Sequence, residues 1–148
     1  MPVRQIDYGT REYEQMLNLR QEILRKPLNL DLMAENLEGE KNDILIGAFD
    51  EDMMLGCCLL TRVDNSTIQL RQMAVQDNLQ GKGVGGTIMH FAENVARDKG
   101  YKKMMMHART TAEGFYEKLG YHIVGDEFME VSLPHFIMEK NLTVRDLW

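Results

Sequence analysis

The order of apolar and polar residues predicts strands in the first half of the chain and a helix in the middle. Segments 43–50, 53–64 and 67–75 are rich in apolar residues and are separated by short polar turns. Their connections are too short for parallel crossovers, so we expect an antiparallel meander. Residues 84–99 then carry apolar side chains at helical spacing, which predicts an amphipathic helix that Gly100 can end.

The remaining segments predict shorter elements. Val3–Asp7 indicates a first strand, and Thr10 can cap a helix whose apolar positions continue to Leu24, before Pro27 ends it. Leu30–Leu37 is expected to form a second short helix. The elements expected after the central helix are a strand over Lys102–Ala108, a short helix that Thr110 or Thr111 caps and that reaches Leu119, and strands over His122–Val124 and Pro134–Asn141.

Together these elements predict an α/β fold. The strand, helix and strand from Thr67 to Ala108 form a βαβ unit, whose two strands should be parallel neighbours. The other strands pair antiparallel, so the expected fold is a mixed, mostly antiparallel central sheet with helices on its faces. A length of 148 residues fits a single domain over 1–148.

Composition and charge narrow the range of partners. The chain has 17 Lys and Arg against 23 Asp and Glu, a formal net charge of −6, whereas nucleic-acid and anionic-membrane binding require a basic face. No window approaches the ~18 consecutive apolar residues of a membrane span, and the N-terminal residues do not resemble a secretory signal. Cys57 and Cys58 are adjacent, so on a strand they point to opposite faces and form neither a disulfide nor a zinc site. We therefore expect a cytoplasmic protein that binds no nucleic acid, membrane or metal.

The strongest candidate for chemistry is the segment 75–86, which joins a predicted strand to the predicted central helix. It contains Gly81, Gly83, Gly85 and Gly86, and glycine lets the backbone turn tightly and lets a ligand approach its amides. The first amides of a helix have no intrahelical partners, and the helix dipole adds positive potential, so phosphate or pyrophosphate is the natural ligand. Glycine inside a helix costs about 1 kcal/mol, which weighs against a merely structural turn.

Two other phosphate-binding loops can be compared with this segment. The nucleoside-triphosphatase loop requires Gly-Lys followed by Ser or Thr, a sequence that does not occur here. Residues 81–86 fit the dinucleotide fingerprint G-x-G-x-x-G literally, but that fingerprint belongs in the first strand-to-helix turn of a parallel sheet. The literal match to this fingerprint is the one feature that supports a nucleotide-binding domain as an alternative.

Two motifs resemble the signatures of the GCN5-related N-acetyltransferase (GNAT) family. Gln80-x-x-Gly83-x-Gly85 resembles the family's Q/R-x-x-G-x-G/A loop. Residues 112–121, Ala-Glu-Gly-Phe-Tyr-Glu-Lys-Leu-Gly-Tyr, resemble its A-x-x-F/L-Y-x-K-x-G-F/Y segment, and the likeness covers the chain from about Asp43 to Leu142. Segments 70–75, 107–109 and 133–135 are similar, more particularly, to the ElaA/YjcF-like branch.

The resemblance implies a defined sheet and acetyl-CoA as cosubstrate. The family fold has about six or seven strands and about four flanking helices, with a V-shaped splay between the strands at 67–75 and 102–108. In the family, the pantetheine arm pairs with the edge of the first of these strands, a backbone amide polarises the thioester carbonyl, and pyrophosphate lies on the glycine loop. The residues implied for acetyl-CoA are Met73, Ala74, Val75, Gln80, Gly81, Lys82, Gly83, Val84, Gly85 and Gly86, with Arg109 as a contact to a CoA phosphate or to an acidic substrate.

The resemblance also implies catalytic roles. Tyr116 matches the family tyrosine that protonates the departing CoA thiolate, as a phenol that keeps its proton at neutral pH can. The general base differs between members, and His107, on the strand that borders the cleft, is the first candidate, either as base or as a contact to the acceptor. Arg71, Glu130 and His135 are candidates for acceptor binding, against the alternative of ordinary solvated or hydrogen-bonded side chains.

The leading hypothesis is an N-acetyltransferase that transfers acetyl from acetyl-CoA to a primary amine by direct attack in a ternary complex. The alternative is a non-catalytic acyl-CoA-binding sensor or interaction module on the same fold. The acidic chain suits a cationic amine, whereas Arg71 and Arg109 suit an anionic sugar phosphate, so the small-molecule acceptor stays open. Exposed edge strands offer a route to a homodimer. The 12 methionines either fill the core or form a deformable wall of the cleft.

Overall fold

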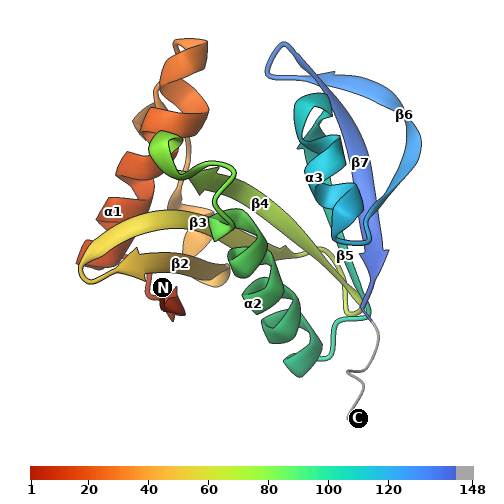
Figure 1. The fold of residues 1–148 in the computed structure, drawn as a ribbon, viewed down its shortest axis with the longest axis horizontal. Helices are drawn as coiled ribbons and strands as arrows, with labels where there is room; N and C mark the ends of the chain where they lie inside the picture. Colours follow the sequence, from red (N-terminus) through yellow and green to blue (C-terminus); the bar gives the residue numbers. More distant parts are fainter. Residues whose placement is uncertain (143–148) are drawn as a thin grey trace. The chain divides into compact units, whose positions relative to one another are not determined.

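The computed structural model describes residues 1–142, which form a seven-stranded sheet in the order β1-β2-β3-β4-β5-β7-β6 with three α-helices (Figure 1). The expected domain 1–148 also includes residues 143–148, which lie outside the described residues. By their internal contacts the described residues divide into two compact units, 1–61 with 72–92, and 62–71 with the residues from 93 onward. The bounds are β1 (Val3–Ile6), α1 (Arg11–Arg20), β2 (Ile44–Asp50), β3 (Met53–Arg62), β4 (Thr67–Val75), α2 (Val84–Asp98), β5 (Lys103–Arg109), α3 (Glu113–Lys118), β6 (His122–Glu130) and β7 (Leu133–Asn141).

The first unit contains the antiparallel strands β1, β2 and β3, with Val3 opposite Ala48 and Ile44 opposite Leu60. Thr10 caps α1 as expected, because its hydroxyl oxygen accepts a hydrogen bond from the Tyr13 amide at 3.3 Å. The apolar side chains of α1 pack against this sheet in one buried cluster. Its members include Tyr13, Met16, Leu19, Leu45, Phe49, Cys57 and Leu59.

The prediction of a second short helix over Leu30–Leu37 was wrong, and the described residues contain three α-helices rather than about four. The helix from Thr10 continues from α1 into a π-helical turn, Gln21–Arg25, whereas Leu32–Ala34 forms a single 3₁₀ turn. The side chain of Asp31 accepts a hydrogen bond from the Met33 amide at 3.0 Å, which competes with helix formation. A segment this short cannot offset the cost of helix nucleation without a packed apolar face.

The second unit contains the other half of the expected sheet. The start of β4 pairs in parallel with β5, from Thr67 opposite Lys103 to Leu70 opposite Met106. β7 pairs antiparallel with both β5 and β6. The mixed, mostly antiparallel sheet is therefore confirmed. The V-shaped opening stays a prediction, because it concerns ends of β4 and β5 that belong to different units.

Two further boundaries differ from the expectation. Neither threonine caps α3 through its side chain, because Thr110–Ala112 forms a 3₁₀ turn and Ala112 occupies the N-cap position. β6 extends beyond the predicted His122–Val124. The prediction ended too early because a register shift between Val124 and Phe128, with Gly125 at φ 78°, interrupts the alternation that identifies a strand.

Six of the 12 methionines and both cysteines are buried in the core of their own units. Met104, Met106 and Met138 are each at most 2% exposed, which agrees with methionine as filler of the core. Cys57 and Cys58 are both buried and free. None of the helices in the described part of the chain is long and apolar enough to span a membrane.

Candidate functional site

The predicted anion-binding loop lies in the first unit, directly before α2. Gly81 and Gly83 have φ angles of 81° and 89°, which only glycine adopts without strain. A Cβ atom added at Gly86 would meet no atom within 4 Å beyond its chain neighbours and its own helix backbone, so packing against the other described residues does not require glycine there. The loop thus presents the first amides of α2 with open space in front of Gly86, which suits an approaching phosphate.

Side chains brace this loop from within. The Gln80 amide group donates to the Val75 carbonyl oxygen at 3.2 Å and lies 3.4 Å from a carboxylate oxygen of Asp77. Both the amide and the hydroxyl of Thr87 donate to the Gly83 carbonyl oxygen, at 3.1 and 2.9 Å. Lys82 is exposed, so its ammonium group is available to a ligand.

The end of β4 carries the predicted pantetheine edge, Met73–Val75. Gln76 fixes this end to β3, because its amide donates to the Leu55 carbonyl oxygen at 3.0 Å and its side chain to that of Met54 at 2.7 Å. Ala74 is buried, whereas Met73 and Val75 are half-buried. Arg71 is also half-buried.

Gln72 departs from regular strand geometry. Its φ angle of 58° lies in the left-handed region, which costs a non-glycine residue about 1–3 kcal/mol. Arg71, Gln72 and Met73 are all half-buried. Such a conformation persists only where surrounding groups hold it.

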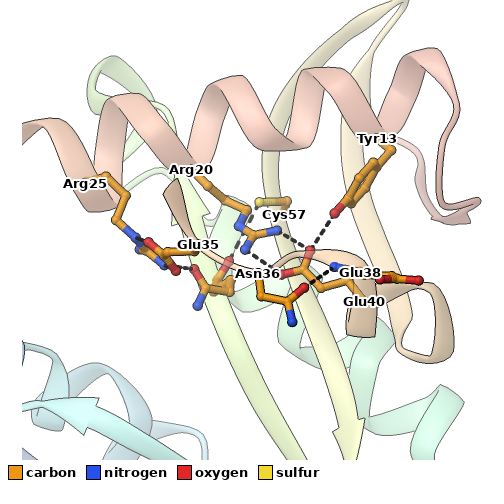
Figure 2. Close-up of polar contacts among 9 residues, drawn as sticks. Tyr13, Arg20, Arg25, Glu35, Asn36, Glu38, Glu40 and Cys57 are labelled. Carbon is orange, nitrogen blue, oxygen red and sulfur yellow. Dashed lines mark hydrogen bonds and ion pairs between the residues drawn. The ribbon is translucent and has the colours of Figure 1, made fainter. Parts of the chain in front are cut away.

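Arg20 and Arg25, two arginines of the first unit, form side-chain hydrogen bonds with residues distant along the chain (Figure 2). Arg25 Nη2 donates to the side-chain oxygen of Gln72 at 3.1 Å, and Arg25 also forms a two-point ion pair with Glu35, at 2.6 and 3.1 Å. Arg20 forms a buried two-point pair with Glu40, at 2.7 and 2.8 Å, and Tyr13 donates to the same carboxylate at 2.8 Å. No sequence motif marks these pairs, because their members are distant along the chain.

Tyr116 lies in the second unit, on α3. It is 6% exposed, and its ring packs edge-on against Phe115 and Tyr121, with ring centroids 4.9 and 5.9 Å apart. The end of α3 is tied to β7, because Lys140 Nζ donates to the Leu119 carbonyl oxygen at 2.7 Å and to the buried carboxylate of Glu93 at 2.9 Å. The hydroxyl of Tyr121 donates to the other oxygen of Glu93 at 2.8 Å; burial and this carboxylate raise the pKa of Tyr121 above its ordinary value.

The structure brings His107 and Glu130 together. His107 Nδ1 lies 2.8 Å from Oε2 of Glu130, and the ring of Phe128 packs edge-on against the imidazole. Because a carboxylate accepts hydrogen bonds, Nδ1 carries the proton and the Nε2 lone pair of a neutral His107 remains available. The two side chains are 34% and 44% exposed, so Nε2 can meet a ligand from solvent.

His135, by contrast, is buried, and its Nδ1 lies 2.8 Å from the Leu133 carbonyl oxygen. A carbonyl oxygen only accepts, so Nδ1 is protonated here as well. Its ring centroid lies 5.9 Å from that of Phe128. His135 also pairs with Arg109 across β5 and β7, so the predicted residues His107, Arg109, Glu130 and His135 gather on adjacent strands.

Strand register places these residues and α3 on opposite faces of the second unit's sheet. Met104 and Lys140 are cross-strand partners, and they contact Tyr121 and Leu119 at the end of α3. Along β5, both His107 and the residue paired with His135 are an odd number of positions from Met104. Because successive side chains of a strand alternate between the two faces, both histidines point to the face opposite Met104. The imidazole of His107 therefore lies on the face that α3 leaves uncovered.

Comparison with protein families matches residues 9–142 to the acetyltransferase (GNAT) domain. Among curated proteins of Bacillus subtilis, the chain is 30% identical to the uncharacterized N-acetyltransferase YjcF over 126 residues, covering 83% of this chain and 88% of that protein. It is 34% identical to the uncharacterized protein YyaT over 82 residues, covering 55% of each, so that match spans about half of YyaT.

Solved structures share the fold at low sequence identity. Escherichia coli ElaA superposes with a TM-score of 0.82 at 16% identity, covering 95% of this chain and 99% of ElaA. An aminoglycoside 6'-N-acetyltransferase complexed with coenzyme A superposes with a TM-score of 0.82 at 19% identity, covering 99% of both chains. The sequence motifs, the fold and the family match agree, and the chain belongs to the GNAT family of acetyltransferases.

Proposed function

We propose that this protein transfers the acetyl group of acetyl-CoA to a primary amine of a small molecule, by direct attack within a ternary complex. The observation that carries this proposal is the loop before α2, where Gly81 and Gly83 adopt left-handed angles and the space before Gly86 is open. The coenzyme A complex of a structural neighbour supports the same cosubstrate.

The first unit supplies the cosubstrate contacts in this proposal. The amides of Gly81, Gly83, Val84, Gly85 and Gly86 bind the pyrophosphate, Lys82 adds a positive charge, and Gln80 keeps the turn closed. The edge of Met73–Val75 pairs with the pantetheine arm, and one of its amides donates to the thioester oxygen. Arg109, in the second unit, is the candidate contact to a further phosphate of CoA or to an acidic substrate.

The second unit supplies the groups that move protons. The amine nitrogen attacks the thioester carbon, and the proton that the nitrogen loses as the C–N bond forms passes through water to Nε2 of His107, which lies on the sheet face opposite α3. When the C–S bond breaks, the Tyr116 hydroxyl donates its proton to the departing thiolate. The products are the N-acetylated amine and CoA with a free thiol, and solvent restores the protonation states of both side chains.

The residues of the site indicate the cosubstrate, but they leave two chemical classes of acceptor. Glu130 and His107 place a carboxylate and an imidazole together, which suits a positively charged amine. Arg71 and the buried His135 suit an anionic group such as a sugar phosphate. We include both classes in the test, together with aminoglycosides, because one structural neighbour is named for that activity.

The experiment is calorimetric titration of the protein with CoA, followed by an amine panel assayed by release of free thiol from acetyl-CoA. The proposal expects CoA binding and thiol release with at least one amine. Absence of CoA binding at millimolar concentration would overturn it. Binding without turnover on any amine would favour the non-catalytic acyl-CoA sensor. A cytoplasmic location and a homodimer stay predictions, the latter checked by analytical ultracentrifugation.

A further inference from the structure

Gln72 is held from two sides, which explains how its left-handed conformation persists. Its side-chain oxygen accepts a hydrogen bond from Arg25 Nη2 at 3.1 Å. Its carbonyl oxygen lies 3.7 Å from the thiol of Cys57, which is fully buried on β3. Side chain and backbone are therefore anchored separately, by two different elements of the first unit.

Arg25 is itself immobilised. Its Nε and Nη2 face the two carboxylate oxygens of Glu35, and the arginine hydrogen bond holds the pKa of Glu35 below its ordinary value. Nη2 carries two hydrogens, so one can serve Glu35 while the other serves Gln72. The Arg25 side chain is only 13% exposed and projects from the end of the π-helical turn toward Glu35 (Figure 2).

The conformation of Gln72 sets the direction of the backbone that follows it. In a regular strand, successive residues point to alternate faces and successive amides point to alternate edges. The φ angle of 58° takes Gln72 out of this regular geometry. The orientation of the Met73 amide is therefore decided by the groups that hold Gln72.

We propose that Arg25 is a positioning residue for acetyl transfer, because it holds Gln72 left-handed and so aims the Met73 amide at the thioester carbonyl oxygen. This inference rests on the proposed function, in which an amide of Met73–Val75 polarises the thioester. Arg25 would then raise kcat by preorganising a hydrogen-bond donor, while the glycine loop determines affinity for CoA. Lysine could supply the charge but not the planar fork that serves two partners.

The test compares Arg25→Met, Arg25→Lys, Gln72→Gly and the Arg25→Met/Gln72→Gly double variant, with an amine that is active in the panel. We expect Arg25→Met to lower kcat about tenfold or more, with KM for both substrates and the Kd of CoA within about threefold of wild type. Arg25→Lys should recover part of the loss. Arg11→Met, at the exposed start of α1, is the matched control and should behave as wild type.

The double variant tests whether the two residues act together. In Gln72→Gly the side-chain partner of Arg25 is absent, so adding Arg25→Met should lower kcat by less than about twofold further. If Arg25→Met does not fold, two variants still test the inference. Arg25→Lys removes the planar guanidinium, and Gln72→Gly removes the side chain that the guanidinium binds.

Each other outcome is decisive. The inference would be overturned by an unchanged kcat in Arg25→Met or by additive losses in the double variant. It would also be overturned by a higher KM for the amine at constant kcat, because Arg25 would then be a contact to the acceptor. These results require an active wild type, so they leave the proposed function intact. A wild-type chain that releases no thiol with any amine would overturn the proposed function and this inference with it.

Discussion

His107 and Glu130 meet across the intervening strand β7, with Nδ1 of the imidazole 2.8 Å from a carboxylate oxygen. The contact assigns the Nδ1 proton and leaves Nε2 as the basic nitrogen. If His107 is the general base, we expect His107→Gln to lower kcat about 100-fold and Glu130→Gln about tenfold, measured by thiol release. Glu127→Gln, on the exposed part of β6, is the control. Wild-type kcat in Glu130→Gln would contradict the pairing.

Tyr116→Phe separates chemistry from binding. The substitution removes one hydroxyl from a buried ring and leaves the ring contacts to Phe115 and Tyr121 in place. We expect kcat to fall about 100-fold, because the thiolate then leaves without a proton donor, while calorimetry gives an unchanged Kd for CoA. Tyr8→Phe, at an exposed tyrosine, should have no effect on either quantity. An active Tyr116→Phe enzyme would remove Tyr116 from the mechanism.

Gly86→Ala tests whether the open space before α2 holds the cosubstrate. The added methyl group meets no atom within 4 Å beyond its chain neighbours and its own helix backbone, and alanine favours a helix over glycine by at most about 1 kcal/mol, so urea unfolding should show equal or higher stability. CoA affinity should nevertheless fall about tenfold, because the methyl group occupies space that the pyrophosphate needs. Gly39→Ala, which also adds a methyl group in open space but outside the loop, should bind CoA as wild type does. Equal affinities in the two variants would argue against this loop as the phosphate site.

The buried pair Arg20–Glu40 should contribute to stability far more than an exposed pair on the same turn. Arg20 and Glu40 are 1% and 5% exposed, so Glu40→Gln leaves a buried guanidinium without its counter-charge and should cost about 3–5 kcal/mol. Glu38 pairs with Lys41 at 3.3 Å, with side chains 76% and 53% exposed, so Glu38→Gln should cost less than about 1 kcal/mol. Urea denaturation measures both changes. Similar losses in the two variants would show that burial does not govern this pair.

Stability should decrease at alkaline pH. Burial raises the pKa of Cys57 to about 12 and raises that of Cys58; burial and nearby carboxylates raise those of Tyr13 and Tyr121. Each group keeps its proton to higher pH in the folded chain than in the unfolded chain. As the pH rises, these groups therefore ionise in the unfolded chain first, which lowers the free energy of unfolding. The free energy of unfolding should therefore be retained below about pH 8.5 and decline above it. Tyr121→Phe should show a shallower decline above about pH 10 than Tyr8→Phe does, and equal slopes would contradict this assignment.

Local patterns account for the elements and for the family. Thr10 capped its helix, strands β2 to β5 lie within a few residues of their expected bounds, and Gly100 follows α2 with φ at 90°. These features depend on neighbouring residues, so they can be deduced from short stretches of sequence. The segment Leu30–Leu37 failed as a helix because tertiary hydrogen bonds, such as that from the Leu32 amide to Gln21, replaced the helical ones.

The glycine loop, the tyrosine segment and the succession of strands and helices can be deduced from short stretches of sequence, because each depends on residues that are close together along the chain. Which distant side chains meet depends on the folded chain. Arg25 reaches Gln72 over 47 positions and His107 reaches Glu130 over 23, and neither spacing follows from a helical or strand period. The left-handed angle of Gln72 likewise depends on Arg25 and Cys57, since glutamine alone does not favour it. Packing and hydrogen bonding between elements therefore set the geometry on which the proposed chemistry depends.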